Sequence, residues 1–185
     1  MKLDYFKNLE ELSSLSALAV RAACEKRDES TVNIRKECDR LLCTTEDALF
    51  SDFMPPLERD DIAALAHCLC RVTDLACELS AEPSATISFM SKNQEAVVCV
   101  KLADELKKAI FRLRCIKRPS SGIPDLCLYR NLICEGRHAH SVMLTSVRKG
   151  RIPKTHAEAI ILTGRLRSEL SYAFDELIEI TLNNI

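Results

Sequence analysis

A long amphipathic helix, expected between Leu57 and Ser80, constrains the fold of this chain more than any other segment. A proline pair at positions 55 and 56 ends the preceding helix, and the acidic turn that follows suits the positive end of a helix dipole. Apolar residues then recur at spacings of three and four: Ile62, Leu65, Leu69, Val72, Ala76 and Leu79. This period predicts one packed face and an opposite, polar face that carries His67, Cys70 and Asp74.

The same period recurs along the chain and predicts an all-α fold. Only four of the 185 residues are glycine, which argues against β-hairpins and for long helices joined by short turns. Six helices are expected, at about Tyr5–Lys26, Thr31–Phe50, Leu57–Ser80, Asn93–Ile116, Asp125–Val147 and Thr155–Asn183. Short connections make successive helices antiparallel, so the sequence predicts an antiparallel six-helix bundle.

The six predicted helices divide into two similar halves of three. In each half a proline-bearing loop precedes the last helix, MPPLERDD at residues 54–61 and RIPKTHAEA at 151–159. Proline-containing segments at Ala81–Ala85 and Arg118–Pro124 are expected as breaks between helices. We therefore expect a single helical domain over residues 1–185, built from a repeat at about 1–81 and a second at about 92–185.

Charge and cysteine usage argue against several classes of protein. There are 26 Lys and Arg against 27 Asp and Glu, a balance that gives no drive toward nucleic acid or an anionic membrane. The ten cysteines lie in apolar-periodic segments, where free Cys behaves as a small hydrophobe and not as part of a disulfide scaffold. The acidic amino terminus is unlike a signal peptide, and no long apolar run is present. We expect a cytoplasmic protein that contacts a membrane only through a partner.

The polar face of the third helix is a candidate metal site. His67, Cys70 and Asp74 stand at i, i+3 and i+7 on that face. Imidazole, thiolate and carboxylate can together hold iron or zinc, and Asp39 on the preceding helix would complete four ligands. The alternative is a solvated polar face with a half-buried cysteine, and the sequence leaves both interpretations open.

The sequence carries few signs of catalysis. Glu135 and His138 form an E-x-x-H pair, a spacing used in di-iron helical bundles, but no second copy of the pair occurs. Neither a glycine-rich phosphate loop nor a nucleophile with a neighbouring base is recognisable. We therefore predict a protein that is not an enzyme. The alternatives are a metal-dependent enzyme on a helical bundle and a helical adaptor or chaperone.

Two motifs on neighbouring predicted helices stand out. The first is ECDR at residues 37–40, and the second is FMPPLERDDIAALAHCLCRVTD at residues 53–74. These motifs resemble the PhoU-like family of phosphate-transport regulators, and more narrowly its single-chain branch, often encoded beside inorganic phosphate permeases of the PiT type. The pattern F-x-x-P, a charged pair, D-I and A-L-A is typical of that branch. Helix number and length extend the resemblance over essentially all 185 residues.

The resemblance implies a two-repeat bundle that regulates or assists inorganic phosphate transport by contact with a permease or sensor protein, with homo-oligomer formation left open. Many members bind iron or zinc through acidic pairs at i, i+4, which stack on one helix face. Here the partner of Asp39 is Arg35, and the partner of Asp74 is Cys70. On the fifth helix, His140 stands where an aspartate is expected, with a glycine four residues before it.

Overall fold

The computed structural model describes residues 3–25, 31–115 and 125–184. Within these ranges the chain forms α-helices and two short 3-10 segments, and no strand. The elements are α1 (Tyr5–Glu25), α2 (Thr31–Ser51), α3 (Arg59–Ser80), α4 (Ser84–Met90), α5 (Gln94–Arg112), η1 (Leu113–Cys115), α6 (Leu126–Arg148), η2 (Lys154–His156) and α7 (Ala157–Asn183). The predicted all-α class is confirmed, and the six long helices correspond to the six expected from the sequence.

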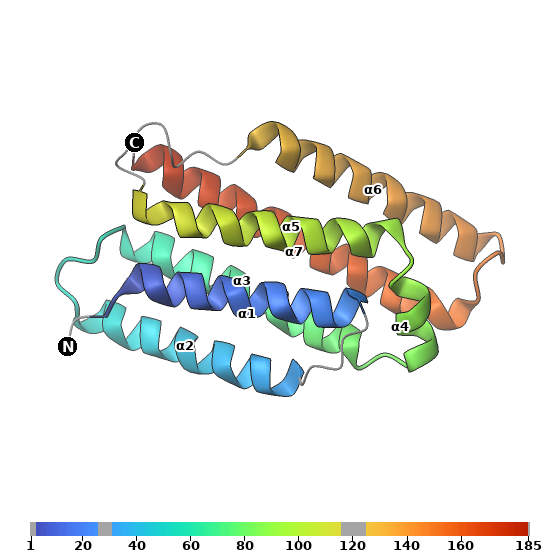
Figure 1. The fold of residues 1–185 in the computed structure, drawn as a ribbon, viewed down its shortest axis with the longest axis horizontal. Helices are drawn as coiled ribbons and strands as arrows, with labels where there is room; N and C mark the ends of the chain where they lie inside the picture. The colour runs from blue at the N-terminus through green and yellow to red at the C-terminus, as the bar shows by residue number, and fades with distance from the viewer. Residues whose placement is uncertain (1–2, 26–30, 116–124, 185) are drawn as a thin grey trace.

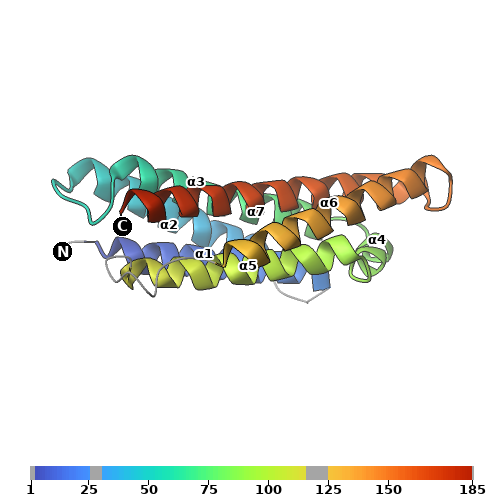
Figure 2. The same cartoon turned by 90° about the horizontal axis from the view of Figure 1, so that it is seen from above.

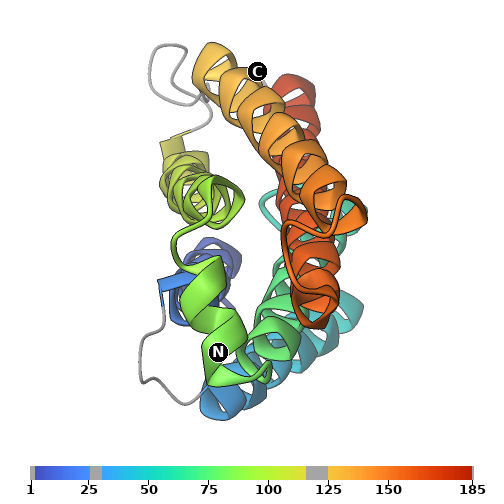
Figure 3. The ribbon, with the colours of Figure 1, turned by 90° about the vertical axis from the view of Figure 1, so that its right-hand side faces the viewer.

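The six long helices lie side by side along the long axis of the molecule, and successive long helices run in opposite directions (Figures 1 and 2). Helix α1 packs against α5 and α3 packs against α7, so these four form the middle of the bundle. Helix α2 covers α1 and α3 at one edge, and α6 covers α5 and α7 at the other (Figure 3). Each half of the chain therefore contributes one edge helix and two central ones.

The burial of the helices follows this arrangement. The whole predicted stripe of α3 is buried, namely Ile62, Leu65, Leu69, Val72, Ala76 and Leu79. The edge helix α2 buries only a narrow stripe, namely Ile34, Cys38, Leu41, Thr45 and Leu49. An edge helix has neighbours on one side only, so its other side stays polar and exposed.

The structure adds a short helix, α4, which begins inside the break predicted at Ala81–Ala85 and continues to Met90. Pro83 occupies the N-cap position of this helix, where the missing N–H of proline costs no intrahelical hydrogen bond. Its carbonyl accepts from the backbone N–H of Thr86 at 2.8 Å and of Ile87 at 3.1 Å. Proline therefore begins a helix here. The break predicted at Arg118–Pro124 lies outside the described residues.

Two further expectations concern the chain as a whole. The order of the helices agrees with two halves of three, because three long helices precede the short helix α4 and three follow it. The boundaries of the domain and of the two repeats remain predictions. Among the described residues, none of the helices combines the length and the apolar character needed to cross a bilayer.

Candidate functional site

The predicted metal ligands of α3 lie toward α2, and two of them, His67 and Asp74, lie within 3.0 Å of a side chain of that helix. Arg35 Nε lies 2.8 Å from Asp74 Oδ1. His67 Nε2 lies 3.0 Å from Glu46 Oε1. Burial raises the pKa of Asp74, and the neighbouring Arg35 guanidinium lowers it by a smaller amount. Both side chains therefore already have partners across the helix interface.

Cys70 does not lie on the exposed polar face that the helical period predicts. Its side chain is only 7% exposed, because α2 packs over this side of α3. Its Sγ lies 3.8 Å from the carbonyl oxygen of Cys38. Burial raises the pKa of the Cys70 thiol to about 12, so the thiol is neutral near pH 7. A metal ion binds the thiolate, so this environment opposes a role for Cys70 as a ligand.

The four predicted ligands do not form a coordination site in this arrangement. Asp39 is exposed on α2, while Asp74 is paired with Arg35. In the part of the chain that the structure describes, no three side chains of His, Cys, Asp or Glu are grouped so that they could hold a metal ion. The Arg35 guanidinium supplies the positive charge beside Asp74 that a metal ion would otherwise supply. Iron or zinc binding remains a prediction for elemental analysis to test.

A second charged cluster lies inside the other half of the bundle and joins its three long helices. Glu95 of α5 is completely buried. Its Oε2 lies 2.9 Å from His140 Nδ1 of α6, and its Oε1 accepts from Arg167 Nε of α7 at 3.3 Å. Burial raises the pKa of Glu95, and the hydrogen bonds and charges of His140 and Arg167 oppose that rise. The cluster fixes the relative position of α5, α6 and α7.

Two helical glycines make room for this cluster. A Cβ on Gly164 would collide with the His140 ring, and a Cβ on Gly136 would lie 2.5 Å from Arg167 Cδ. Each glycine therefore lets the side chain of a neighbouring helix lie directly on its backbone. Neither Glu95 nor Arg167 is singled out by the sequence analysis above. The sequence did contain one indication of this cluster, a single glycine inside each of two predicted helices. A glycine at such a position usually allows close packing.

The E-x-x-H pair of α6 does not face an internal site. Glu135 and His138 are both exposed. Glu135 accepts a hydrogen bond from the side chain of Gln94 on α5. A di-iron centre needs its ligands to converge inside a bundle, and these two side chains point away from the core.

The seam between α3 and α7 is closed by a further ion pair. Arg71 Nε lies 3.1 Å from Glu169 Oε2. The Arg71 guanidinium also lies 5.6 Å from the centre of the Tyr172 ring, within the range of a cation–π contact. The charges of Arg71 on α3 and Glu169 on α7 therefore neutralise each other.

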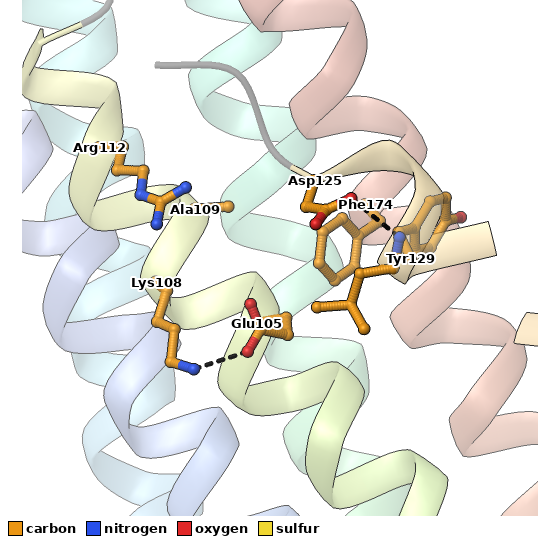
Figure 4. Close-up of a pocket in the computed structure, with 8 residues that line it drawn as sticks. Glu105, Lys108, Ala109, Arg112, Asp125, Tyr129 and Phe174 are labelled. Atoms are coloured by element: carbon orange, nitrogen blue, oxygen red, sulfur yellow. Dashed lines mark hydrogen bonds and ion pairs between the residues drawn. The ribbon is translucent and has the colours of Figure 1, made fainter. Parts of the chain in front are cut away.

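A small hollow of about 180 Å³ lies between α5, α6 and α7 (Figure 4). Its residues are Glu105, Lys108, Ala109, Arg112, Asp125, Leu128, Tyr129 and Phe174. The Tyr129 and Phe174 rings stack with their centres 4.5 Å apart, and burial raises the pKa of Tyr129 to about 12. Lys108 Nζ lies 2.6 Å from Glu105 Oε1, so these two charges compensate each other. The walls carry both signs of charge and select for neither anions nor cations.

Comparisons with known proteins identify the fold. No protein-family model matches the sequence, and no curated protein matches it. Two crystal structures from Shewanella oneidensis MR-1 do match. A PhoU-like protein has a TM-score of 0.64 and 15% sequence identity, covering 97% of this chain and 96% of its own. A predicted PhoU-like phosphate regulatory protein has a TM-score of 0.59 at the same identity and coverage. The likeness spans both chains almost completely, and this protein therefore has the PhoU-like fold.

Proposed function

We propose that this chain is a non-enzymatic regulator or accessory protein of inorganic phosphate transport that acts by contact with a permease or sensor protein. The observation that carries the proposal is the likeness, over 97% of this chain, to a protein described as a predicted PhoU-like phosphate regulatory protein. The motifs at residues 37–40 and 53–74, which resemble those of phosphate-transport regulators, support it independently. Because a fold by itself does not determine function, the proposal depends on both observations together.

Several charged side chains join neighbouring helices of the bundle. They form the pairs Arg35–Asp74, His67–Glu46 and Arg71–Glu169, in which each side chain contacts a side chain of a neighbouring helix. These pairs join α2 to α3 and α3 to α7, so they position helices. In this proposal a rigid bundle presents its surface to a transporter or sensor and shifts that partner between working states.

A deletion experiment tests the proposed function. The gene is removed from the organism that encodes the chain, and uptake of radioactive phosphate is followed at limiting and at excess phosphate. We expect the response of uptake to external phosphate to change and to return when the wild-type gene is supplied. Unaltered uptake and unaltered expression of phosphate-responsive genes under both conditions would contradict the proposal.

A further inference from the structure

Three large apolar side chains project into solvent where α2 ends and the loop to α3 begins. Phe50, Phe53 and Met54 are 93%, 89% and 71% exposed. We call these three residues the apolar tip. Single exposed hydrophobic residues are common on protein surfaces, but three within five residues, each so fully exposed, are typical of an interaction site.

The apolar tip is held in place by one arginine. Arg59 Nε donates to the carbonyl oxygen of Leu49 at 3.1 Å. Arg59 Nη2 donates to the carbonyl oxygens of Asp52 at 2.5 Å and of Phe53 at 3.4 Å. The guanidinium thus satisfies carbonyls at the C-terminal end of α2 and in the loop, where no intrahelical donor is available. The loop is organised before any partner arrives, which lowers the entropy lost on binding.

The surroundings of the apolar tip are strongly acidic. Residues 46–61 contain six carboxylates and one arginine, a local net charge of −5 in a chain whose net charge is −1. The carboxylates are Glu46, Asp47, Asp52, Glu58, Asp60 and Asp61. The pKa of Asp61 is raised, first by burial and then by the charges of Glu58, Glu179, Glu176 and Asp60. The acidic region therefore extends from the loop to the C-terminal part of α7.

We propose that the apolar tip docks into an apolar pocket, rimmed by lysine and arginine, on a partner protein. Buried aromatic anchors surrounded by complementary charge are the usual basis of such contacts. An anionic lipid surface would be repelled by the same carboxylates. This inference rests on the proposed function, because cytoplasmic loops of membrane proteins carry an excess of Lys and Arg, as the proposed partner surface requires.

Membrane vesicles provide the test. The purified full chain is mixed with inverted membrane vesicles from the organism that encodes it, and with protein-free liposomes made from the lipids of the same membranes. We expect binding to the vesicles only, abolished when their exposed proteins are first digested with protease. Binding should also weaken as salt is raised from about 50 to 500 mM, because screening reduces charge complementarity.

Matched variants assign the binding to the apolar tip. The double variant Phe50→Ser with Phe53→Ser should bind at least about tenfold more weakly, as expected for loss of anchor residues. The control, Val142→Ser with Ile161→Ser, changes two exposed apolar residues of α6 and α7 and should bind like wild type. A third variant, Arg59→Gln, keeps all three apolar side chains but frees the loop, and it should also weaken binding.

Several outcomes would overturn the inference. Equal binding of the wild type and the apolar-tip variant would show that the contact lies elsewhere. Binding to protein-free liposomes would make the apolar tip a lipid anchor, and self-association lost in the variant would make the occupant a second copy of this chain. If deletion of the gene changes phosphate uptake as expected but the chain does not bind the vesicles, the docking surface alone is refuted. Normal binding without any phosphate phenotype refutes the proposed function alone.

Discussion

The Arg35 guanidinium, on α2, meets the Asp74 carboxylate, on α3, with Nε 2.8 Å from Oδ1. Both side chains are partly exposed, so the pair contributes at most about 1 kcal/mol to stability. Its larger effect is electrostatic. The resemblance to PhoU-like proteins implies an acidic residue at position 35, and this chain instead places a fixed positive charge there. A cation approaching Asp74 is repelled by Arg35 and finds its ligand already paired.

Restoring the acidic pairs should therefore create a metal site. In the double variant Arg35→Glu with Cys70→Glu, carboxylates stand four residues from Asp39 and from Asp74, a spacing that places each pair on one helix face. We expect this variant to bind zinc or iron more tightly than the wild type. Isothermal titration and elemental analysis after purification without chelator measure the difference.

The matched control for this gain is Arg35→Gln, which removes the positive charge without adding a carboxylate. It should gain much less affinity than the double variant. The wild type should be compared with Asp39→Ala plus Asp74→Ala in the same elemental analysis. If the wild type carries near-stoichiometric metal and this double variant carries none, the conclusion that Arg35 keeps metal ions away from Asp74 is refuted.

Removing one charge from the buried cluster of the second half should destabilise the protein. In Arg167→Met, the completely buried Glu95 carboxylate keeps only His140 as a partner. Loss of one member of a buried pair costs about 3 kcal/mol, so a fall in Tm of several degrees is expected. Urea denaturation measures the free energy of unfolding directly. The double variant Glu95→Leu with Arg167→Met removes both charges and should recover much of the loss. No recovery would mean that the cost lies in packing.

Substituting Gly164 by alanine tests the close approach of α6 to α7. On an open helix surface this change would stabilise the protein by about 1 kcal/mol. Here the new Cβ would collide with the His140 ring, which Glu95 holds in place, and we expect destabilisation of about 1–3 kcal/mol. The same substitution made together with His140→Ala should be stabilising relative to His140→Ala alone. If Gly164→Ala changes the free energy of unfolding in the same direction with and without the His140 ring, the close contact between them is refuted.

Cysteine reactivity should follow burial. Cys43, Cys127 and Cys134 are exposed. Burial raises the pKa of both Cys24 and Cys70 to about 12, so these thiols stay neutral and shielded. Because the thiolate is the reactive form, iodoacetamide at about pH 8 should label the exposed group first. Peptide mass spectrometry over time identifies each site. Fast labelling of Cys70 in the native protein would place it on an exposed face after all.

The raised pKa of Glu95 predicts a particular pH dependence of stability. A carboxyl whose pKa is higher in the folded state than its ordinary value of 4.5 holds its proton more tightly when folded. Raising the pH from 4.5 through the folded-state pKa therefore removes stability from the wild type. Glu95→Gln lacks this titration. The free energy of unfolding of the wild type should fall relative to that of the variant across this window. A constant difference between the two proteins would show that Glu95 titrates alike in both states.

Much of the fold is determined by local information in the sequence. The spacing of Ile62, Leu65 and Leu69 is enough to place a helix and its buried face, because the helical period is set by the backbone alone. The scarcity of glycine and the proline positions set the number of long helices. Among the described residues, α4 is the one helix that the sequence does not predict, since Pro83 can end one helix or begin the next.

The environment of Cys70 depends on which side of α3 is covered by α2. A helical period separates two faces, but it does not say whether a second helix packs on the polar one. The structure places α2 there, which buries Cys70 and pairs Asp74 with Arg35. The sequence predicts the candidate residues of this site but not their partners.

The buried cluster of Glu95, His140 and Arg167 was decided by tertiary structure alone. These residues are separated by 45 and 72 positions along the chain from Glu95, and no local pattern relates them. The sequence by itself determined the helices, because each depends on contacts within a few residues. The contacts between side chains of different helices depend on how the helices cross and how closely they approach. Such contacts, for example that of His140 with Gly164, exist only in the packed bundle.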